Sequence, residues 1–191
     1  MKNTSRMIFQ VAVGPQSNLY AHCIESVSNY CDKHDITHHV LTAPQLWIKP
    51  DPFNSGRSEE SYMKYGGYLP IYEKENAFNY LPEFDQIAIV DADIYIREDA
   101  PNIFDDMSDD AAFGAVVERD MPIEDWYKNK IINYSQMQYG QLHSNASDFR
   151  PNELGFEFCN MGLIVLNSKN FLPYLEAVSY THLTLPTKRI V

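Results

Sequence analysis

The chain has 191 residues, a length typical of one domain. Hydrophobic residues make up 45% of it, which is enough for a packed core and argues against disorder throughout. The formal net charge of -11 disfavours a nucleic-acid partner, because nucleic-acid phosphates are bound mainly through lysine and arginine.

The cysteines and the hydropathy pattern indicate a reducing, aqueous environment. Cys23, Cys31 and Cys159 form an odd and widely spaced set, which predicts reduced thiols and neither a disulfide framework nor a metal-ligand cluster. The polar start of the chain lacks the features of a signal peptide, and no stretch approaches the roughly 18 apolar residues of a membrane span. We therefore expect a soluble, cytoplasmic protein.

The first elements follow a strand–helix–strand order. Met7–Val13 is apolar and β-branched, and Gly14 with the following proline ends it, which predicts a buried strand. Leu19–Lys33 has helical apolar spacing, with Asn18 as its expected N-cap. Ile36–Leu41 reads as a second strand. This order predicts an α/β fold built on a mostly parallel sheet flanked by helices.

The pattern continues after a long irregular stretch, Thr42–Tyr68, which contains several prolines and glycines. Leu69–Tyr80 is expected to be helical, and Gln86–Val90 is expected to be a central strand, after which Ile94–Ile96 resumes an extended run. The later predicted elements are a strand at Ala111–Val117, a helix at Glu124–Tyr139, a strand at Asn160–Leu166 and a helix from Ser168 to Ala177.

The end of the sequence differs in character from the rest. From about Ser179 the residues continue no periodic pattern and resemble translated sequencing-adaptor sequence. We therefore expect one domain over residues 1–178, incomplete at its C-terminus, followed by a non-native tail over 179–191. A native C-terminal strand at Thr181–Leu185 is the alternative.

Two carboxylates, Asp91 and Asp93, follow the apolar run that ends at Val90. Ligands of open α/β sheets bind at the carboxyl ends of strands. Two neighbouring carboxylates repel each other there, and a hard cation held by oxygen ligands removes that repulsion. The pattern thus favours a Mg²⁺ or Mn²⁺ site with positions left for diphosphate oxygens, whereas two solvated turn aspartates are the structural alternative.

The stretch Leu81–Ile96, with Asp91-Ala92-Asp93 inside it, resembles the region around the DxD motif of glycosyltransferase family 8 and neighbouring GT-A families, which include glycogenin and bacterial lipopolysaccharide galactosyltransferases. The resemblance implies a GT-A-type, Rossmann-like fold. It also implies metal-dependent transfer of a sugar from a nucleotide-diphosphate sugar, most simply a UDP-sugar, to a hydroxyl of a sugar, glycan or other acceptor. Its metal would be Mn²⁺ or Mg²⁺.

The same resemblance assigns roles to particular residues. Asp91 and Asp93 would bind the metal and diphosphate, and Lys74 would add a positive charge beside the diphosphate. The remaining donor-binding positions fall in two groups: Val11, Ala12, Val13 and Tyr20 for the base and ribose, and Ala92, Asn160, Met161 and Gly162 near the diphosphate and sugar. The first loop departs from the acidic-plus-tyrosine pattern of the family. The third metal ligand of the family, a histidine, would lie in a C-terminal region that this chain lacks.

Other enzyme classes fit the sequence less well. A haloacid-dehalogenase-type phosphatase also uses Asp-x-Asp, but it calls for Thr or Val where Tyr95 stands. A GT-A-fold nucleotidyltransferase calls for a glycine-rich, basic first loop, and Gly14–Tyr20 contains neither lysine nor arginine. A metal- and nucleotide-binding chain without turnover is the non-enzymatic alternative.

Several polar and aromatic residues keep two interpretations. Glu118 and Asp120 face either a sugar or solvent, and Trp126 with Tyr127 belongs either to the core or to an acceptor platform. The histidines His34, His38 and His39 lack a matched carboxylate or cysteine spacing, so a structural role is expected for them.

Overall fold

The computed structural model describes residues 4–14, 17–45, 63, 70–143 and 156–175. Most of the predicted irregular stretch Thr42–Tyr68 and all of the tail from Ser179 lie outside these residues. The chain divides into two compact units, Met1–Gly114 with Val165–Val191, and Ala115–Ile164. Across the described parts of both units, no helix is long and apolar enough to cross a membrane.

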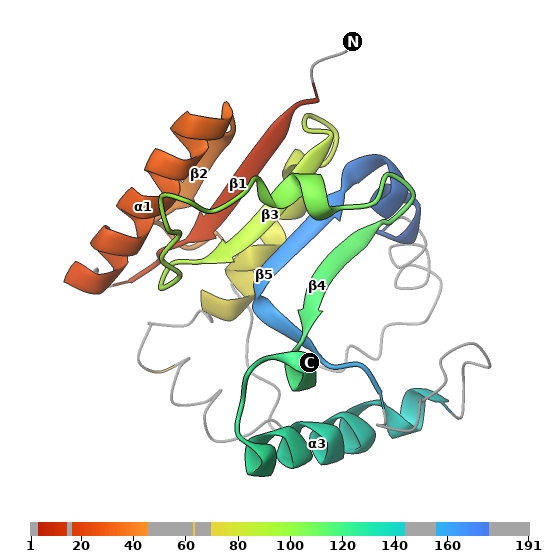
Figure 1. Ribbon diagram of the computed structural model, residues 1–191. Helices are drawn as coiled ribbons and strands as arrows, with labels where there is room; N and C mark the ends of the chain where they lie inside the picture. Colours follow the sequence, from red (N-terminus) through yellow and green to blue (C-terminus); the bar gives the residue numbers. More distant parts are fainter. Residues whose placement is uncertain (1–3, 15–16, 46–62, 64–69, 144–155, 176–191) are drawn as a thin grey trace. The chain divides into compact units, whose positions relative to one another are not determined.

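The first unit is organised around parallel strands. β1 pairs in parallel with β2 on one side and with β3 on the other, in the strand order β2-β1-β3-β5-β4 (Figure 1). The strands are β1 (Arg6–Val11), β2 (Thr37–Leu41), β3 (Gln86–Asp91), β4 (Phe113–Val117) and β5 (Cys159–Asn167), of which β4 and β5 each have residues in both units. Each lies within two residues of a strand predicted from sequence, and the predicted α/β class is confirmed.

The predicted helices are present, with one correction. They are α1 (Asn18–His34), η1 (Pro70–Tyr80), α3 (Asp125–His143) and the helical residues 168–175. Two short helices, η2 (Ile103–Asp106) and η3 (Glu118–Asp120), were not predicted. The N-cap of α1 is Ser17 and not Asn18, because the Ser17 hydroxyl accepts a hydrogen bond from Tyr20 N at 3.2 Å. η1 is a 3₁₀ helix.

The predicted extended run Ile94–Ile96 joins no strand. The chain turns directly after β3, and residues 94–97 belong to no strand. The backbone N–H of Ile96 donates to the hydroxyl of Ser26 in α1 at 3.0 Å and so pairs with a helix side chain. An apolar run that satisfies its backbone in this way reads like a strand in sequence without forming one.

The two faces of β1 are packed differently. On one face the ring of Phe9 stacks on His39 with centroids 5.2 Å apart, and Tyr80 of η1 lies 5.1 Å from His39. Side chains alternate along a strand, so the fully buried Gln10 points to the opposite face. Figure 1 shows α1 and the segment after β3 in front of the strands and η1 behind them. The largest buried side chains of this unit include Met7, Ile8, Phe9, Leu81, Ile87, Phe104 and Leu166.

The second unit has a buried arginine and an exposed aromatic surface. Arg119 is only 4% exposed, and its guanidinium donates to the carbonyl of Phe156 at 3.0 Å. The Tyr127 hydroxyl donates to the Glu118 carboxylate at 2.9 Å, and this bond raises the pKa of Tyr127. Trp126 is 67% exposed, so the core interpretation of this tryptophan is wrong.

Candidate functional site

The carboxyl ends of β1 and β3 lie side by side. Val11, the last residue of β1, is the register partner of Asp91, the last residue of β3. The chain leaves β1 through α1 to reach β2 on one side, whereas β3 lies on the other side. Ligands of open α/β sheets bind at such a reversal of strand order, outside the carboxyl ends of the strands. Asp91 therefore stands where the fold class places a ligand.

Lys74 of η1 meets Asp91 at this edge. Its ammonium Nζ lies 2.5 Å from Oδ1 of Asp91, and the two side chains are 17% and 37% exposed. The preceding residue, Glu73, is fully buried, and its carboxylate accepts hydrogen bonds from Gln45 N at 3.0 and 3.1 Å and from Asn76 Nδ2 at 2.7 Å. These bonds hold the middle of η1 and thereby the backbone that carries Lys74.

A tight turn carries the second carboxylate. The carbonyl of Asp91 accepts a hydrogen bond from Ile94 N at 3.2 Å, which closes the turn over Ala92 and Asp93. Ala92 is 6% exposed, whereas the side chain of Asp93 is exposed. The same carbonyl accepts a second hydrogen bond, from Gln10 Nε2 at 3.1 Å. The turn thus directs Asp93 to solvent from a backbone that is anchored at its first residue.

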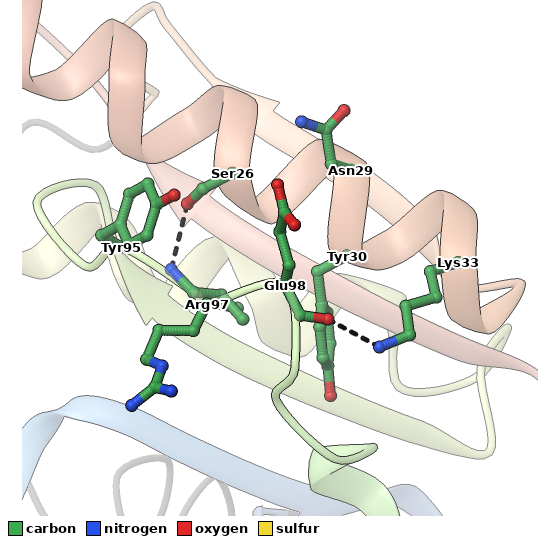
Figure 2. A pocket seen from close by; sticks show the side chains of 8 residues that line it. Ser26, Asn29, Tyr30, Lys33, Tyr95, Arg97 and Glu98 are labelled. Atoms are coloured by element: carbon green, nitrogen blue, oxygen red, sulfur yellow. Dashed lines mark hydrogen bonds between the residues drawn. The ribbon is translucent and has the colours of Figure 1, made fainter.

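The segment after the turn is hydrogen-bonded to side chains of α1. Ser26 accepts from Ile96 N, and Lys33 donates to the carbonyl of Glu98 at 2.7 Å (Figure 2). Further along, the Tyr30 hydroxyl accepts from Ile103 N at 2.7 Å and donates to the carbonyl of Pro101 at 2.8 Å. Burial raises the pKa of Tyr30, so this hydroxyl keeps its proton and can serve as donor and acceptor together.

A small cavity of about 120 Å³ lies between α1 and this segment. Figure 2 shows the side chains around it, which include Ser26, Asn29, Tyr30, Lys33 and Tyr95. The hydroxyls of Ser26 and Tyr30 and the ammonium of Lys33 already bond to the backbone of the segment. The polar groups around the cavity therefore join α1 to the segment, which indicates a structural role for them.

The predicted nucleotide-side residues lie at and beyond the end of β1. Ala12 N donates to the carbonyl of Leu41 at 2.8 Å, and the side chains of Ala12 and Val13 are buried. Gly14 follows with φ of 102°, a left-handed conformation that favours glycine. Tyr20 is half-buried in the first turn of α1. Because their side chains are buried, Ala12 and Val13 offer a ligand their backbone atoms.

The predicted sugar-side residues belong to the second unit, whereas Asp91 and Lys74 belong to the first. The sugar-side residues are Asn160, Met161 and Gly162, and all three lie in β5. Asn160 Oδ1 accepts a hydrogen bond from Gly162 N at 2.9 Å, and Met161 is 52% exposed. The amide oxygen of Asn160 is thus engaged within its own strand.

The donor atoms near the turn suit a hard cation. Carboxylate oxygens are the ligands that Mg²⁺ prefers, and a magnesium site completes its shell with water and substrate phosphates. Asp93 carries such oxygens on an exposed side chain, and Asp91 carries them on a half-buried side chain that pairs with Lys74. Within the described part of the chain, no three His, Cys, Asp or Glu side chains gather as a metal-binding group. A cation held by Asp91 and Asp93 would therefore need further ligands, such as diphosphate oxygens and water.

The histidines of β2 have structural contacts. His38 Nε2 lies 2.8 Å from Gln10 Oε1, and His39 packs between Phe9 and Tyr80. Burial is the main cause that lowers the pKa of His38; nearby Asp32 opposes it and His39 adds to it. Sequence reasoning overlooked Gln10, although a glutamine inside the apolar run Met7–Val13 is a visible signal of a buried polar contact.

The backbone of this chain is distantly similar to those of two solved structures. No family model matches the sequence, and no curated protein matches it. A solved glycosyltransferase involved in the glycosylation of the major capsid of PBCV-1 aligns with 95% of this chain and 68% of its own, at 11% identity and a TM-score of 0.47. Mouse xyloside xylosyltransferase 1 in its apo form aligns with 96% of this chain and 73% of its own, at 12% identity and a TM-score of 0.44. Likeness at this level concerns the course of the backbone, so the function has to be inferred from this chain's own side chains.

Proposed function

We propose that the chain carries the donor-binding part of a GT-A-type glycosyltransferase, which transfers a sugar from a nucleotide-diphosphate sugar to an acceptor hydroxyl. The observation that carries the proposal is the pairing of Lys74 with Asp91 at the carboxyl end of β3, beside the end of β1. Two carboxylates and a lysine at one sheet edge suit a diphosphate, since the cation and the ammonium both neutralise phosphate oxygens. The sequence resemblance around Asp91-Ala92-Asp93 supports the same class.

In the proposed reaction, an oxygen of the acceptor hydroxyl forms a bond to the anomeric carbon of the donor sugar. The bond from that carbon to the diphosphate oxygen breaks, the electron pair stays on the nucleoside diphosphate, and the hydroxyl proton passes to solvent. Lys74 is the residue of this chain that meets the charge on the leaving diphosphate, because its ammonium stands at the same edge. Asp91 and Asp93 would hold Mn²⁺ or Mg²⁺, which supplies Lewis-acid stabilisation of the leaving group when bound.

The test is calorimetric titration of the chain with a UDP-sugar in the presence and absence of Mn²⁺. Binding is expected with Mn²⁺ and is expected to be lost in Asp93→Ala, whose exposed side chain contributes little to folding. Asp99→Ala is the matched control. Asp99 is an exposed aspartate that pairs with Arg97, and its replacement removes the same charge from the same segment.

Two outcomes would overturn the assignment. One is UDP-sugar binding that is equal with and without Mn²⁺ and equal in Asp93→Ala. The other is hydrolysis of a simple phosphate ester that requires Asp91, which would favour the phosphatase alternative instead. Mn²⁺-dependent binding of the UDP-sugar without turnover would identify a donor-binding chain that lacks catalytic parts.

A further inference from the structure

Gln10 is a polar side chain in the middle of a buried strand. It is 0% exposed, and its neighbours in β1, Phe9 and Val11, are apolar. A buried amide costs folding free energy unless its donors and acceptors are paired. Both ends of the Gln10 amide are paired: one lies 3.1 Å from the carbonyl of Asp91, and the other lies 2.8 Å from Nε2 of His38.

The partners fix the orientation of this amide. A backbone carbonyl only accepts hydrogen bonds, so the end of Gln10 that faces Asp91 must be the NH₂ group. Oε1 then faces His38, whose Nε2 must carry a proton and donate it. A directed chain of hydrogen bonds therefore runs from His38 in β2 through Gln10 in β1 to Asp91 at the end of β3.

The chain of bonds ends on the atom that closes the carboxylate-bearing turn. The Asp91 carbonyl also accepts from Ile94 N, so Gln10 and Ile94 share one acceptor. Backbone pairing joins Gln10 to Val90 and Val11 to Asp91 along the same strands. The Gln10 side chain thus adds a bond beyond the last ladder pair, at the point where β3 ends and the turn begins.

We propose that Gln10 is a positioning residue, which sets the Asp91–Ile94 turn and thereby the carboxylates of Asp91 and Asp93. A strand interior built for packing alone would carry an apolar side chain here, as Phe9 and Val11 do. Removal of a residue that hydrogen-bonds to metal ligands without touching the metal typically lowers metal affinity by about 10–100-fold. The inference rests on the proposed function where metal binding is concerned, and on geometry alone where the turn is concerned.

The experiment compares variants of Gln10 and His38 by two measurements on the full chain. One is Mn²⁺ affinity, and the other is the hydrogen-exchange rate of the Ile94 amide without metal. Gln10→Leu keeps the approximate volume and removes both bonds, so Mn²⁺ affinity should fall about ten-fold. Exchange at Ile94 should become several-fold faster.

His38 supplies a second, independent pair of variants. His38→Leu leaves Gln10 Oε1 without its donor and should weaken Mn²⁺ binding in the same direction as Gln10→Leu. His38→Gln retains an N–H donor and should keep both measurements near the wild-type values. These variants decide the matter if Gln10→Leu does not fold.

Tyr80→Phe is the control, since it removes a hydroxyl that contacts His39 on the opposite face of the strands. It should leave both measurements unchanged. Equal Mn²⁺ affinity and equal Ile94 exchange in Gln10→Leu and wild type would overturn the positioning role. If the wild type binds no Mn²⁺, the proposed function fails, and the exchange rate of Ile94 alone then decides whether Gln10 sets the turn.

Discussion

The ammonium of Lys74 and Oδ1 of Asp91 lie 2.5 Å apart, so the carboxylate that would hold a divalent cation already has a counter-ion. The Lys74 side chain is more buried than that of Asp91. Dissolved salt therefore screens this ion pair less than it screens an ion pair at the open surface. A divalent cation bound there would therefore compete with the ammonium for one carboxylate. A diphosphate would relieve the competition, since it offers Lys74 a new partner.

Lys74→Met should affect the metal and the nucleotide sugar in opposite directions. Mn²⁺ alone should bind about five-fold more tightly, because removing an adjacent positive charge is worth roughly 1 kcal/mol. UDP-sugar binding in the presence of Mn²⁺ should weaken, because the diphosphate loses a cation. Calorimetric titration with each ligand measures both effects, and Lys74→Arg keeps the charge as control. A parallel change of both affinities in Lys74→Met would contradict the competition.

Glu73→Ala should destabilise the fold by about 3 kcal/mol. The fully buried carboxylate accepts from Gln45 N and Asn76 Nδ2, and hydrogen bonds to charged groups contribute about 1.5–3 kcal/mol each. Urea unfolding followed by circular dichroism measures the change in the free energy of unfolding. Glu75→Ala is the control: Glu75 is exposed in the same helix, and its replacement should change this free energy by less than about 0.5 kcal/mol. Equal losses in the two variants would argue against the anchoring role of Glu73.

His38 should make the protein less stable in mild acid. Its pKa is lowered from 6.5 in the folded chain, chiefly by burial, so below about pH 6.5 the unfolded chain takes up a proton that the folded chain does not. The free energy of unfolding should therefore fall as the pH drops from about 6.5 towards the lower folded pKa, and should be independent of this group above pH 7.5 or so. Urea unfolding at several pH values compares wild type with His38→Gln. The variant should show a flatter pH dependence, and identical profiles would show that His38 has the same pKa in both states.

Periodicity and turn residues predicted the parallel core of the fold and the position of Asp91 at a strand end. These predictions succeed because β3 (Gln86–Asp91) buries the continuous apolar run Ile87–Val90, which is visible in sequence. Ile94–Ile96 has a similar apolar pattern but joins no strand, because Ser26, 70 residues earlier, supplies the hydrogen-bond partner of Ile96. A local pattern carries no information about a partner that distant.

The candidate site was only partly visible in the sequence. Family resemblance suggested Lys74 and the two aspartates, and the structure brings Lys74 to Asp91. Gln10 and Glu73, which bond to the backbone near these residues, were missed. Neither a motif nor a spacing reveals the partner of a buried polar side chain. The N-cap of α1 was misplaced by one residue because serine and asparagine are both good caps.

The attachment of residues 94–103 to α1 constrains the residue types of the two segments unequally. Ser26, Tyr30 and Lys33 provide bonds to a segment that begins directly after the carboxylate-bearing turn. The partners in the segment are backbone N–H and C=O groups, so substitution of its side chains leaves these bonds in place, whereas substitution of Ser26, Tyr30 or Lys33 removes them. The demand on residue type therefore falls on the helix, whereas the segment, about 70 residues further along the chain, can exchange its side chains and keep the same attachment.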